Sequence, residues 1–280
     1  MMKFTQAQQQ RIIELDAEGK YKGYIKDKEF DSSKEREDDF QKIEDDLVNK
    51  NKKRLEELQG RHQQPVLRRM EFRLVELLKE SGFMEVVTPI KLAKGHLEKM
   101  GIDEEHSLWK QVYWLEEDNY CLRPMLAPNL YYLLGYFENS LSKPIKIFEV
   151  GPCFRRESRG SKHLSEFTMM NLVELGPKGD PTERLKSLIA ELMDYLELEY
   201  ELEEEESVVY GKTIDVVVNG IEVGSGAVGP HLLDEAWNIS DSWVGVGFGL
   251  ERLIICKEEF ESIKRVGRSL IYQDGVRLNI

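Results

Sequence analysis

The chain has few of the features that mark a secreted, membrane-bound or zinc-stabilised protein. Its three cysteines, Cys121, Cys153 and Cys256, are far apart and form no CxxC pair. No pair of histidines has the spacing of metal ligands, so neither a disulfide framework nor a zinc site is expected. The first residues contain no apolar segment of the kind that signals secretion, and no run approaches the roughly 20 apolar residues of a membrane span. We expect a cytoplasmic protein with buried thiols and no membrane partner.

Positive charge is also scarce, because 39 Lys and Arg face 52 Asp and Glu and the net charge is −13. Such a balance on its own argues against a nucleic-acid partner. The acidity is concentrated, however, in residues 29–46, with nine acids and three bases, and residues 183–206, with ten acids and two bases. The rest of the chain is therefore nearly neutral, and a local basic field there can still attract an anionic partner.

Three basic patches lie outside the acidic stretches. Residues 50–73 hold eight bases and three acids, and residues 154–163 hold four bases and one acid. The third patch, near the C-terminus, consists of Lys264, Arg265, Arg268 and Arg277, opposed by Asp274 alone. Any one of these patches could be no more than a solvated helix face. Three basic patches on an acidic chain, however, favour an anionic partner.

The first 64 residues read as a helical extension. Thr5-x-x-Gln8 is a capping box that predicts a helix ending near Gly19, and Ser32-x-x-Glu35 predicts a second helix. Leu55 and Leu58 suggest a third helical stretch. This section has few apolar residues, so we expect it to pack against the rest of the protein or against a partner instead of forming its own core.

From residue 65 onward the pattern predicts an α+β domain with a mainly antiparallel sheet flanked by helices. Pro65 begins an amphipathic helix that ends at Gly82, a further helix spans residues 181–200, and another begins near Leu250. Asn219-Gly220 is a hairpin signal, and the acidic run Glu203–Glu206 reads as a solvated loop. The expected strands are Val112–Leu115, Tyr120–Arg123, Ile145–Val150, Phe167–Leu175, Thr213–Val218, Ile221–Gly226 and Trp243–Phe248.

Three motifs carry the chemistry. Gly245-Val-Gly-Phe-Gly-Leu-Glu-Arg252 places glycines at every second strand position, which leaves one face bare for a flat ligand beside Arg252. Phe154-Arg-Arg-Glu157, a polar loop, and His163-Leu-x-Glu-Phe167 place arginines and a carboxylate on one sheet face, and arginine suits phosphate oxygens. Gly82-Phe-x-Glu-Val-x-Thr-Pro89 follows the long amphipathic helix.

Together and in this order, these segments resemble motifs 1, 2 and 3 of the class II aminoacyl-tRNA synthetases. The stretches 122–131, 167–171 and 209–211, with Trp243 in the motif 3 strand, resemble the pyrrolysyl-tRNA synthetase family, over roughly residue 65 to the C-terminus. The helical front has the character of the bacterial or short-form catalytic chains, which lack the separate N-terminal tRNA-binding domain. The resemblance implies a class II synthetase fold with a tRNA-binding extension over residues 1–64 and a catalytic core over residues 65–280.

The implied activity is ATP-dependent activation of pyrrolysine, followed by transfer to the 3′ end of a UAG-decoding tRNA. The substrate carboxylate attacks the α-phosphate of ATP, so no protein nucleophile is required. By the resemblance, Arg155 holds the α-phosphate, Arg252 reaches the γ-phosphate and covers an adenine stacked on Phe167, and Glu157 reads the adenine amino group. His163 and Leu164 support the nucleotide. Glu222 and Ser225 help to place Mg²⁺.

The same match implies a roomy apolar amino-acid pocket. Asn171 is its main polar group and is expected to donate to the side-chain amide carbonyl of pyrrolysine, while Tyr210 closes over the ligand. No acidic residue is placed to receive the ammonium of free lysine, which should therefore be rejected. The expected pocket residues are Ala127, Leu130, Tyr131, Leu134, Asn171, Val173, Tyr210, Ala227 and Trp243.

The expected partners are the cognate tRNA and a second copy of the chain, since motif 1 usually forms a dimer interface. The tRNA contacts are expected in the three basic patches, among them Lys52, Lys53, Arg54, Arg61, Arg159 and Lys162. Nothing resembles an anticodon-binding module, so we expect the tRNA body and acceptor stem to be read. Two alternatives stay open: another class II synthetase, such as one for phenylalanine or phosphoserine, and a catalytically inactive paralogue that regulates or binds tRNA.

Overall fold

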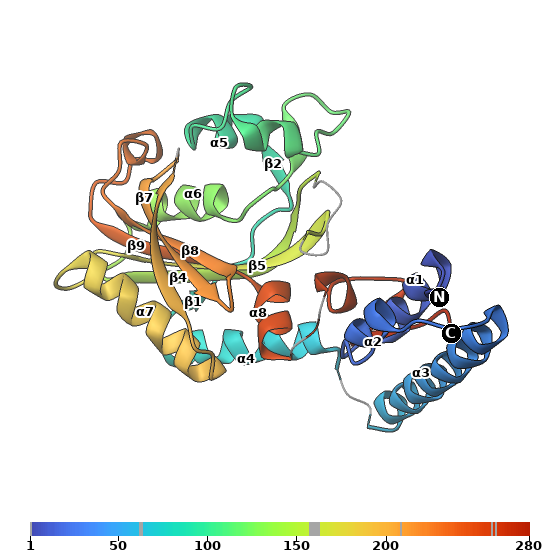
Figure 1. Cartoon of the computed structure of the whole chain (residues 1–280). Coiled ribbons are helices and arrows are strands. Elements are labelled where there is room, and N and C mark those ends of the chain that lie inside the picture. Colours follow the sequence, from blue (N-terminus) through green and yellow to red (C-terminus); the bar gives the residue numbers. More distant parts are fainter. Residues whose placement is uncertain (1, 62–63, 157–162, 208, 259, 261) are drawn as a thin grey trace.

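One large sheet organises the chain from β1 to α8 (Figure 1). The computed structural model describes residues 2–61, 64–156, 163–207, 209–258, 260 and 262–280. Within these residues the sheet has seven strands in the order β1-β4-β5-β9-β8-β7-β6, and only β1 and β4 run parallel. The strands are β1 Met84–Glu85, β4 Ile145–Phe154, β5 Glu166–Leu175, β6 Glu201–Ser207, β7 Gly211–Val218, β8 Ile221–Gly229 and β9 Trp243–Gly249. The expected mainly antiparallel sheet flanked by helices is confirmed.

Helices cover the sheet on both faces. On one face α4 (Val66–Glu80), α7 (Pro181–Leu196) and α8 (Leu250–Lys257) bury one apolar cluster against the strands. On the other face α5 (Lys94–Lys99) and α6 (Ala127–Phe137) bury a second cluster, with the short pair β2 (Lys91–Ala93) and β3 (Tyr120–Leu122). Figure 1 shows α4 and α7 on the opposite side of the strands from α5 and α6. The sheet therefore sits between two separate cores.

Local signals in the sequence locate several element ends correctly. Thr5 forms both hydrogen bonds of its capping box with Gln8 and starts α1 (Gln6–Leu15). Gly82 has a φ of +81° just after α4, a conformation that favours glycine at the end of a helix. Asn219 and Gly220 have φ values of +50° and +69° and join β7 to β8, as a tight hairpin requires. These three predictions are confirmed.

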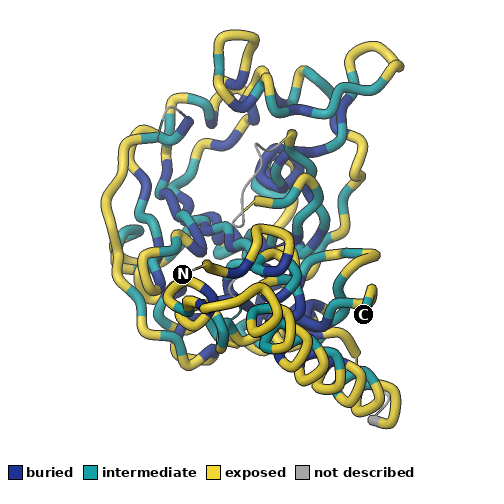
Figure 2. Tube along the Cα trace, turned by 45° about the vertical axis from the view of Figure 1, so that its right-hand side comes forward, coloured by how far each residue is buried: buried dark blue, intermediate teal, exposed yellow. Residues whose placement is uncertain are grey.

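The front section differs from the expectation because it has a core of its own. It contains α1, α2 (Lys22–Asp27) and α3 (Ser33–Arg61), and α3 is one helix of 29 residues where two helical stretches were expected. Its buried apolar side chains are Phe4, Ile12, Leu15, Ile25, Phe30, Ile43 and Leu47, with the C-terminal Ile280 packed against them. Figures 1 and 2 show these helices beside the sheet-containing part, near both termini.

Three further predictions of secondary structure need correction, and one helix was missed. Val112–Leu115 is not a strand: the short 3₁₀ helix η1 (Ser107–Gln111) precedes it, and Trp114 makes only an isolated bridge to Cys121. Glu203–Glu206 is not a loop, because it lies in edge strand β6 and pairs with β7. The expected helix 181–200 ends at Leu196, where Glu197 takes a left-handed conformation. Helix α6 was not predicted.

The C-terminal segment ties the front section to the sheet. It consists of η3 (Ile263–Arg265), β10 (Tyr272–Gln273) and β11 (Val276–Arg277). The buried guanidinium of Arg265 donates to the carbonyls of Ile13, Glu14 and Asp16 at the end of α1, and Arg277 pairs with Glu14. Arg268 donates to the Thr168 hydroxyl, so three of the four basic residues in the expected C-terminal tRNA patch are engaged inside the protein and that part of the expectation is corrected.

Cys121 and Cys153 are buried, and burial raises the pKa of each thiol to about 12. They are neutral core residues, as expected, while Cys256 is only partly buried. Within the part of the chain that the structure describes, no helix is both long enough and apolar enough to cross a bilayer.

Candidate active site

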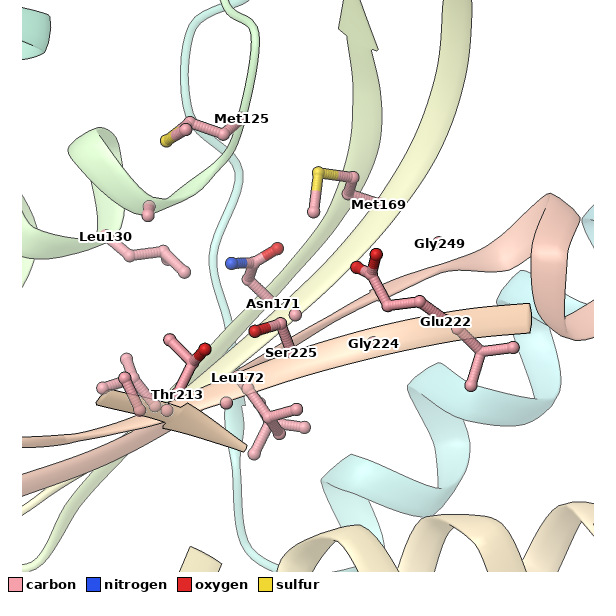
Figure 3. Close-up of a pocket in the computed structure, with 18 of the residues that line it drawn as sticks. Met125, Leu130, Met169, Asn171, Leu172, Thr213, Glu222, Gly224, Ser225 and Gly249 are labelled. Atoms are coloured by element: carbon pink, nitrogen blue, oxygen red, sulfur yellow. The ribbon is translucent and has the colours of Figure 1, made fainter. Parts of the chain in front are cut away.

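A cleft of about 290 Å³ lies on the α6 side of the sheet and is lined by β5, β8 and β9. Side chains along a strand point alternately to the two faces of the sheet, and every second residue of β5 forms part of the cleft floor. These residues are Phe167, Met169, Asn171 and Val173. Figure 3 shows Met169 and Asn171 on one side, facing Glu222 and Ser225 of β8. Every described residue that the sequence assigned to ATP or to the amino acid lines this one cleft.

One end of the cleft is a deep apolar pocket. Tyr131 and Trp243 meet edge to face with ring centroids 5.4 Å apart, and Tyr210 meets Trp243 at 6.1 Å. Ala127 and Ala227 contribute little bulk to the wall. The residues gathered here are Ala127, Leu130, Tyr131 and Leu134 of α6, Asn171 and Val173 of β5, Ala227 of β8, Trp243 of β9, and Tyr210 just before β7.

Asn171 is the polar group of this pocket, and one of its atoms has no partner. Its Oδ1 is buried and accepts no hydrogen bond from any described residue. An orphaned polar atom in a ligand-sized cleft is the type of group that a ligand satisfies. The neighbouring strand leaves room for the amide because a Cβ on Gly247 would lie 3.0 Å from both its oxygen and its nitrogen.

Two phenols line the pocket, and a carboxyl group lies behind its wall. Tyr131 and Tyr210 share a hydrogen bond, and burial is the main cause that raises the pKa of each phenol well above its usual value, so both stay neutral. Asp234 lies behind Trp243 and accepts from its indole nitrogen at 2.7 Å. Burial also raises the pKa of Asp234. This carboxyl group is held by Trp243 and is not part of the cleft wall.

The other end of the cleft carries the residues expected to bind the nucleotide. Arg155 donates from Nε to the carbonyl of Pro124 at 2.9 Å, and its guanidinium lies 5.3 Å from the centre of the Phe167 ring. The Arg155 guanidinium thus covers the Phe167 ring in this structure. His163 and Leu164 line the same end.

Glu222 and Ser225 both face the cleft although strict alternation would place them on opposite faces of β8. The register of β8 with β7 passes from Val217↔Glu222 to Val216↔Gly224, so Val223 is an extra residue that forms a bulge. Arg252 donates to the carbonyl of Glu222 at 2.8 Å, and its guanidinium lies 3.6 Å from the Glu222 carboxylate. The bulge therefore brings two oxygen ligands and one guanidinium to the same place.

These oxygen donors fit a magnesium ion that shares its coordination with phosphate. Ser225 lines the cleft and donates its proton to Asp215 at 2.6 Å, which leaves the lone pairs of its hydroxyl oxygen available to a metal ion. The described residues hold no group of three or more His, Cys, Asp or Glu that would form a complete protein site for a metal. Hard oxygen ligands in small number are the usual arrangement for Mg²⁺ bound together with a nucleotide.

Some predicted residues lie elsewhere. Glu157, Arg159 and Lys162 fall outside the described residues. Lys52 and Lys53 are exposed on α3, away from the cleft, and Arg61 is the last residue of that helix. Arg54 is less accessible, because its guanidinium lies 5.8 Å from the centre of the Phe260 ring.

A buried charge network that supports the cleft was missed in the sequence. Arg123, with 2% of its surface exposed, pairs with the equally buried Glu149 at 2.6 Å. Both hydrogen-bond to Thr88 of motif 1, whose hydroxyl also accepts from Asn129 of α6. The network joins the motif 1 segment to the helix that walls the pocket. Thr88, Arg123 and Asn129 stand in segments already quoted and Glu149 stands in an expected strand, but only their positions in the fold reveal the contacts.

Further lining residues were also missed: Met125, Met169, Thr213, Val223, Glu251 and Ile263. Met169 was accessible to sequence reasoning, because it stands two residues from both Phe167 and Asn171 on the same strand. Ile263 was not, since it comes from the C-terminal segment. No cysteine lies in the described wall, and the Ser225 hydroxyl donates to Asp215. The cleft therefore suits binding and charge stabilisation more than nucleophilic catalysis by the protein.

Comparisons with known proteins agree with this chemistry. Residues 53–244 match the family model described as phenylalanyl tRNA synthetase beta chain CLM domain. A curated relative, the phenylalanine–tRNA ligase beta subunit of Pyrococcus abyssi (strain GE5 / Orsay), is 37% identical over 125 residues. That match covers 42% of this chain and 21% of the relative, so the matched part corresponds to about a fifth of that subunit.

Two solved structures are similar over the whole chain. A crystal structure of pyrrolysyl-tRNA synthetase from Desulfitobacterium hafniense has a TM-score of 0.91 and 46% identity, and the match covers 100% of both chains. A second structure of a pyrrolysyl tRNA synthetase from the same organism has a TM-score of 0.88 and 44% identity, over 99% of this chain and 98% of the other.

Proposed function

The chain belongs to the pyrrolysyl-tRNA synthetases and matches the phenylalanyl-tRNA synthetase beta chain family model, and from this we propose that it is a pyrrolysine–tRNA ligase. It would activate pyrrolysine with ATP and transfer the amino acid to the 3′ end of a UAG-decoding tRNA. The observation that carries the proposal is the apolar pocket with the unpartnered amide oxygen of Asn171, which would accept from the N–H of a ligand amide, whereas the resemblance had led us to expect Asn171 to donate. Pyrrolysine has the matching chemistry, a bulky apolar ring attached to lysine through an amide.

In the activation step the chain binds and orients two reactants. The pyrrolysine ring occupies the apolar end of the cleft, and Asn171 hydrogen-bonds its amide group. Arg155 leaves the Phe167 ring and holds the α-phosphate, where negative charge develops as the amino-acid carboxylate attacks. Because the carboxylate is the nucleophile, proximity and charge stabilisation suffice and the protein supplies no base.

The nucleotide end completes the proposed site. Phe167 offers a face for adenine, His163 and Leu164 flank the nucleotide, and Arg252 reaches the γ-phosphate from the first turn of α8. Glu157 is proposed to read the adenine amino group. Glu222 and Ser225 would hold Mg²⁺, which when bound neutralises phosphate charge. Arg252 already lies beside Glu222, so both groups are placed for the same phosphates.

The pocket also accounts for the proposed selectivity. Free lysine would bring an ammonium group into a wall of Leu, Ala, Val and aromatic side chains, where no described acidic side chain lies. A buried ammonium without a partner is costly. Phenylalanine would fit the apolar wall but would leave the Asn171 amide unsatisfied and most of the pocket unfilled.

Two macromolecular partners are part of the proposal. Lys52 and Lys53 on α3, with Arg61, Arg159 and Lys162, would contact the tRNA backbone, and the first 64 residues would serve as its binding extension.

The second partner is another copy of the chain. Motif 1 carries the exposed apolar side chains of Met84 and Val87 at edge strand β1, and exposed Phe72 on the preceding helix α4 and exposed Ile90 just after the motif extend this apolar set. Such a cluster beside an unpaired strand edge favours a homodimer interface.

ATP–pyrophosphate exchange tests the amino-acid assignment. With pyrrolysine, lysine and phenylalanine offered separately, we expect exchange with pyrrolysine alone. Exchange with phenylalanine instead would favour the alternative that the chain is a synthetase specific for phenylalanine, which is also the amino acid named in the matching family model. Exchange with none of the three would favour an inactive paralogue.

A further inference from the structure

Glu251 is a buried carboxylate at the point where β9 ends and α8 begins. It lines the nucleotide end of the cleft and is 1% exposed. Strand β5 pairs with β9 only from Met169↔Gly249 onward, so the N–H of Thr168 has no strand partner on that side. Both carboxylate oxygens of Glu251 accept from this N–H at 2.9 Å. Glu251 thus extends the sheet by one hydrogen-bonded position beyond the end of β9.

Thr168 is held a second time, by the C-terminal segment. Arg268 donates from Nη1 to the Thr168 hydroxyl at 2.8 Å. The same guanidinium lies 3.7 Å from the buried carboxylate of Glu71 on α4 and 3.6 Å from Glu166. The Thr168 side chain also hydrogen-bonds the carboxyl group of Glu251. Thr168 is fully buried between these groups.

The held residue is adjacent to the nucleotide end of the cleft. Thr168 points away from the cleft, while its neighbours Phe167 and Met169 point into it. The backbone of Thr168 therefore sets where the Phe167 ring lies. The C-terminal segment passes close by, since a Cβ on Gly267 would lie 2.5 Å from Cδ1 of Leu164 and 3.8 Å from Cγ of Glu251.

We propose that Arg268 and Glu251 are positioning residues for ATP, which clamp Thr168 from the rear of the sheet and so fix the Phe167 ring and Leu164 for the adenine. The proposal rests on the proposed function in one respect, the assignment of this end of the cleft to the nucleotide. It goes beyond that function by giving the C-terminal segment, which lies outside the three motifs, a part in nucleotide binding.

The physical basis is the number of buried groups that depend on one guanidinium. Arg268 donates to the Thr168 hydroxyl and its charge acts on the Glu251 carboxyl group, while Glu71, the third buried group beside it, is also paired with Arg68. Without Arg268, the Glu251 carboxyl group loses the positive charge that acts on it and Thr168 loses a donor, both of which are unfavourable in a dry environment. Relaxation of Thr168 would displace the ring next to it by a fraction of an ångström, which is enough to weaken a stacked ligand.

The test compares Arg268→Met with Arg268→Lys and with the control Arg184→Met. Arg184 pairs at 2.8 Å with Glu174, a carboxylate buried at the opposite end of β5. The control therefore also removes an arginine from a buried glutamate of the same strand, but far from the nucleotide end. Isothermal titration calorimetry with ATP alone gives the Kd, and pyrophosphate exchange gives KM for ATP and for pyrrolysine.

For Arg268→Met we expect the Kd and KM for ATP to rise about tenfold, with KM for pyrrolysine changed less than about twofold. Arg268→Lys should recover most of the loss, and Arg184→Met should lower the melting temperature without changing ATP binding. Unchanged ATP binding in Arg268→Met, or equal weakening of both substrates, would overturn the proposal.

A second variant serves if Arg268→Met does not fold. Thr168→Val keeps the buried volume and removes only the hydroxyl, and we expect its Kd for ATP to rise about threefold or more; an unchanged Kd would also contradict the clamp. The calorimetric test needs no amino acid. A wild-type chain that binds ATP but does not exchange with pyrrolysine would therefore refute the substrate and leave the clamp standing.

Discussion

Asn171 and Glu251 are the two side chains whose surroundings most constrain their roles. Asn171 keeps a buried oxygen without a partner in a wall of apolar groups. Glu251 is also buried, but it has partners on two elements. The first pattern indicates a group that waits for a ligand, and the second indicates a group that supports its neighbours.

Replacing Asn171 with alanine should affect the amino acid far more than the nucleotide. The variant loses the hydrogen bond to the pyrrolysine amide, and such a bond in a buried site contributes about 1 to 2 kcal/mol. We expect kcat/KM for pyrrolysine to fall about tenfold or more in pyrophosphate exchange, with KM for ATP within about twofold of wild type. Equal losses for both substrates would refute the assigned role.

Glu251 should make stability depend on pH. Burial raises its pKa from 4.5 to about 7, opposed by the Thr168 hydrogen bonds and the charge of Arg268. Because the folded state holds the proton more tightly than the unfolded state, this group stabilises the fold at low pH. The contribution is lost as pH rises from 4.5 to about 7 and amounts to about 3 kcal/mol.

Urea denaturation of wild type and Glu251→Gln at pH 5 and pH 8 measures this effect. The difference in free energy of unfolding between the two proteins should shift in favour of the glutamine variant as pH rises. A difference that is the same at both pH values would show that Glu251 keeps an ordinary pKa in the folded protein.

At the level of elements, the glycines of β9 have different reasons for being small. A Cβ at Gly247 would press on the Asn171 amide at 3.0 Å, whereas a Cβ at Gly245 would meet its nearest neighbour, the carbonyl of Leu172, at 3.4 Å. The absence of a side chain at Gly247 therefore leaves room for the Asn171 amide, and the absence of one at Gly245 matters less for that amide.

Gly247→Ala is expected to raise KM for pyrrolysine about fivefold or more by displacing Asn171, an overpacking effect of about 1 kcal/mol or more. Gly245→Ala, the matched change on the same strand, should have a smaller effect. Pyrophosphate exchange with varied pyrrolysine measures both, and a larger effect at Gly245 would contradict the assigned contact.

The elements also show how far the sequence leads. Capping residues, the Asn219-Gly220 turn and the spacing of the motifs predict most strands and the residues that share the cleft. Periodicity alone fails at β6, because its exposed glutamates have no apolar face and the strand exists through pairing with β7. It also gives no sign of the Val223 bulge, which brings Glu222 and Ser225 together, since an extra residue in a ladder depends on the partner strand.

At the scale of the whole molecule, charge is arranged by region. The acidic part of α3 precedes its basic end, and the basic C-terminal residues Arg265 and Arg277 bind the front section instead of facing solvent. The sequence revealed the segregation of charge, but not which arginines are engaged within the fold. We expect residues 29–46 and 183–206 to lie away from the tRNA phosphates.

Lys52 and Lys53 test the tRNA surface. Changing both to glutamine should raise KM for the tRNA several-fold and lower the slope of log KM against log salt by about 1 to 2, because each phosphate contact contributes about 0.7 to 0.9. The control changes Lys34 and Lys42, which lie in the acidic part of the same helix. Aminoacylation kinetics that respond equally to both pairs would argue against a local tRNA contact.

Val87 tests the homodimer. It is 88% exposed beside β1, at one edge of the sheet, and Val87→Asp would place a charge in the proposed interface. Sedimentation should show a shift from dimer to monomer in this variant. Leu232→Asp, which changes an equally exposed residue after β8, should remain dimeric. A wild-type chain that sediments as a monomer would contradict the proposal.

The most direct measurement is aminoacylation of a UAG-decoding tRNA with pyrrolysine by the purified chain, with ATP and Mg²⁺ present. A pyrrolysine–tRNA ligase should charge this tRNA with pyrrolysine and leave it uncharged when lysine or phenylalanine is supplied. Charging with phenylalanine, or no charging with pyrrolysine by a folded and ATP-binding chain, would contradict the proposed function.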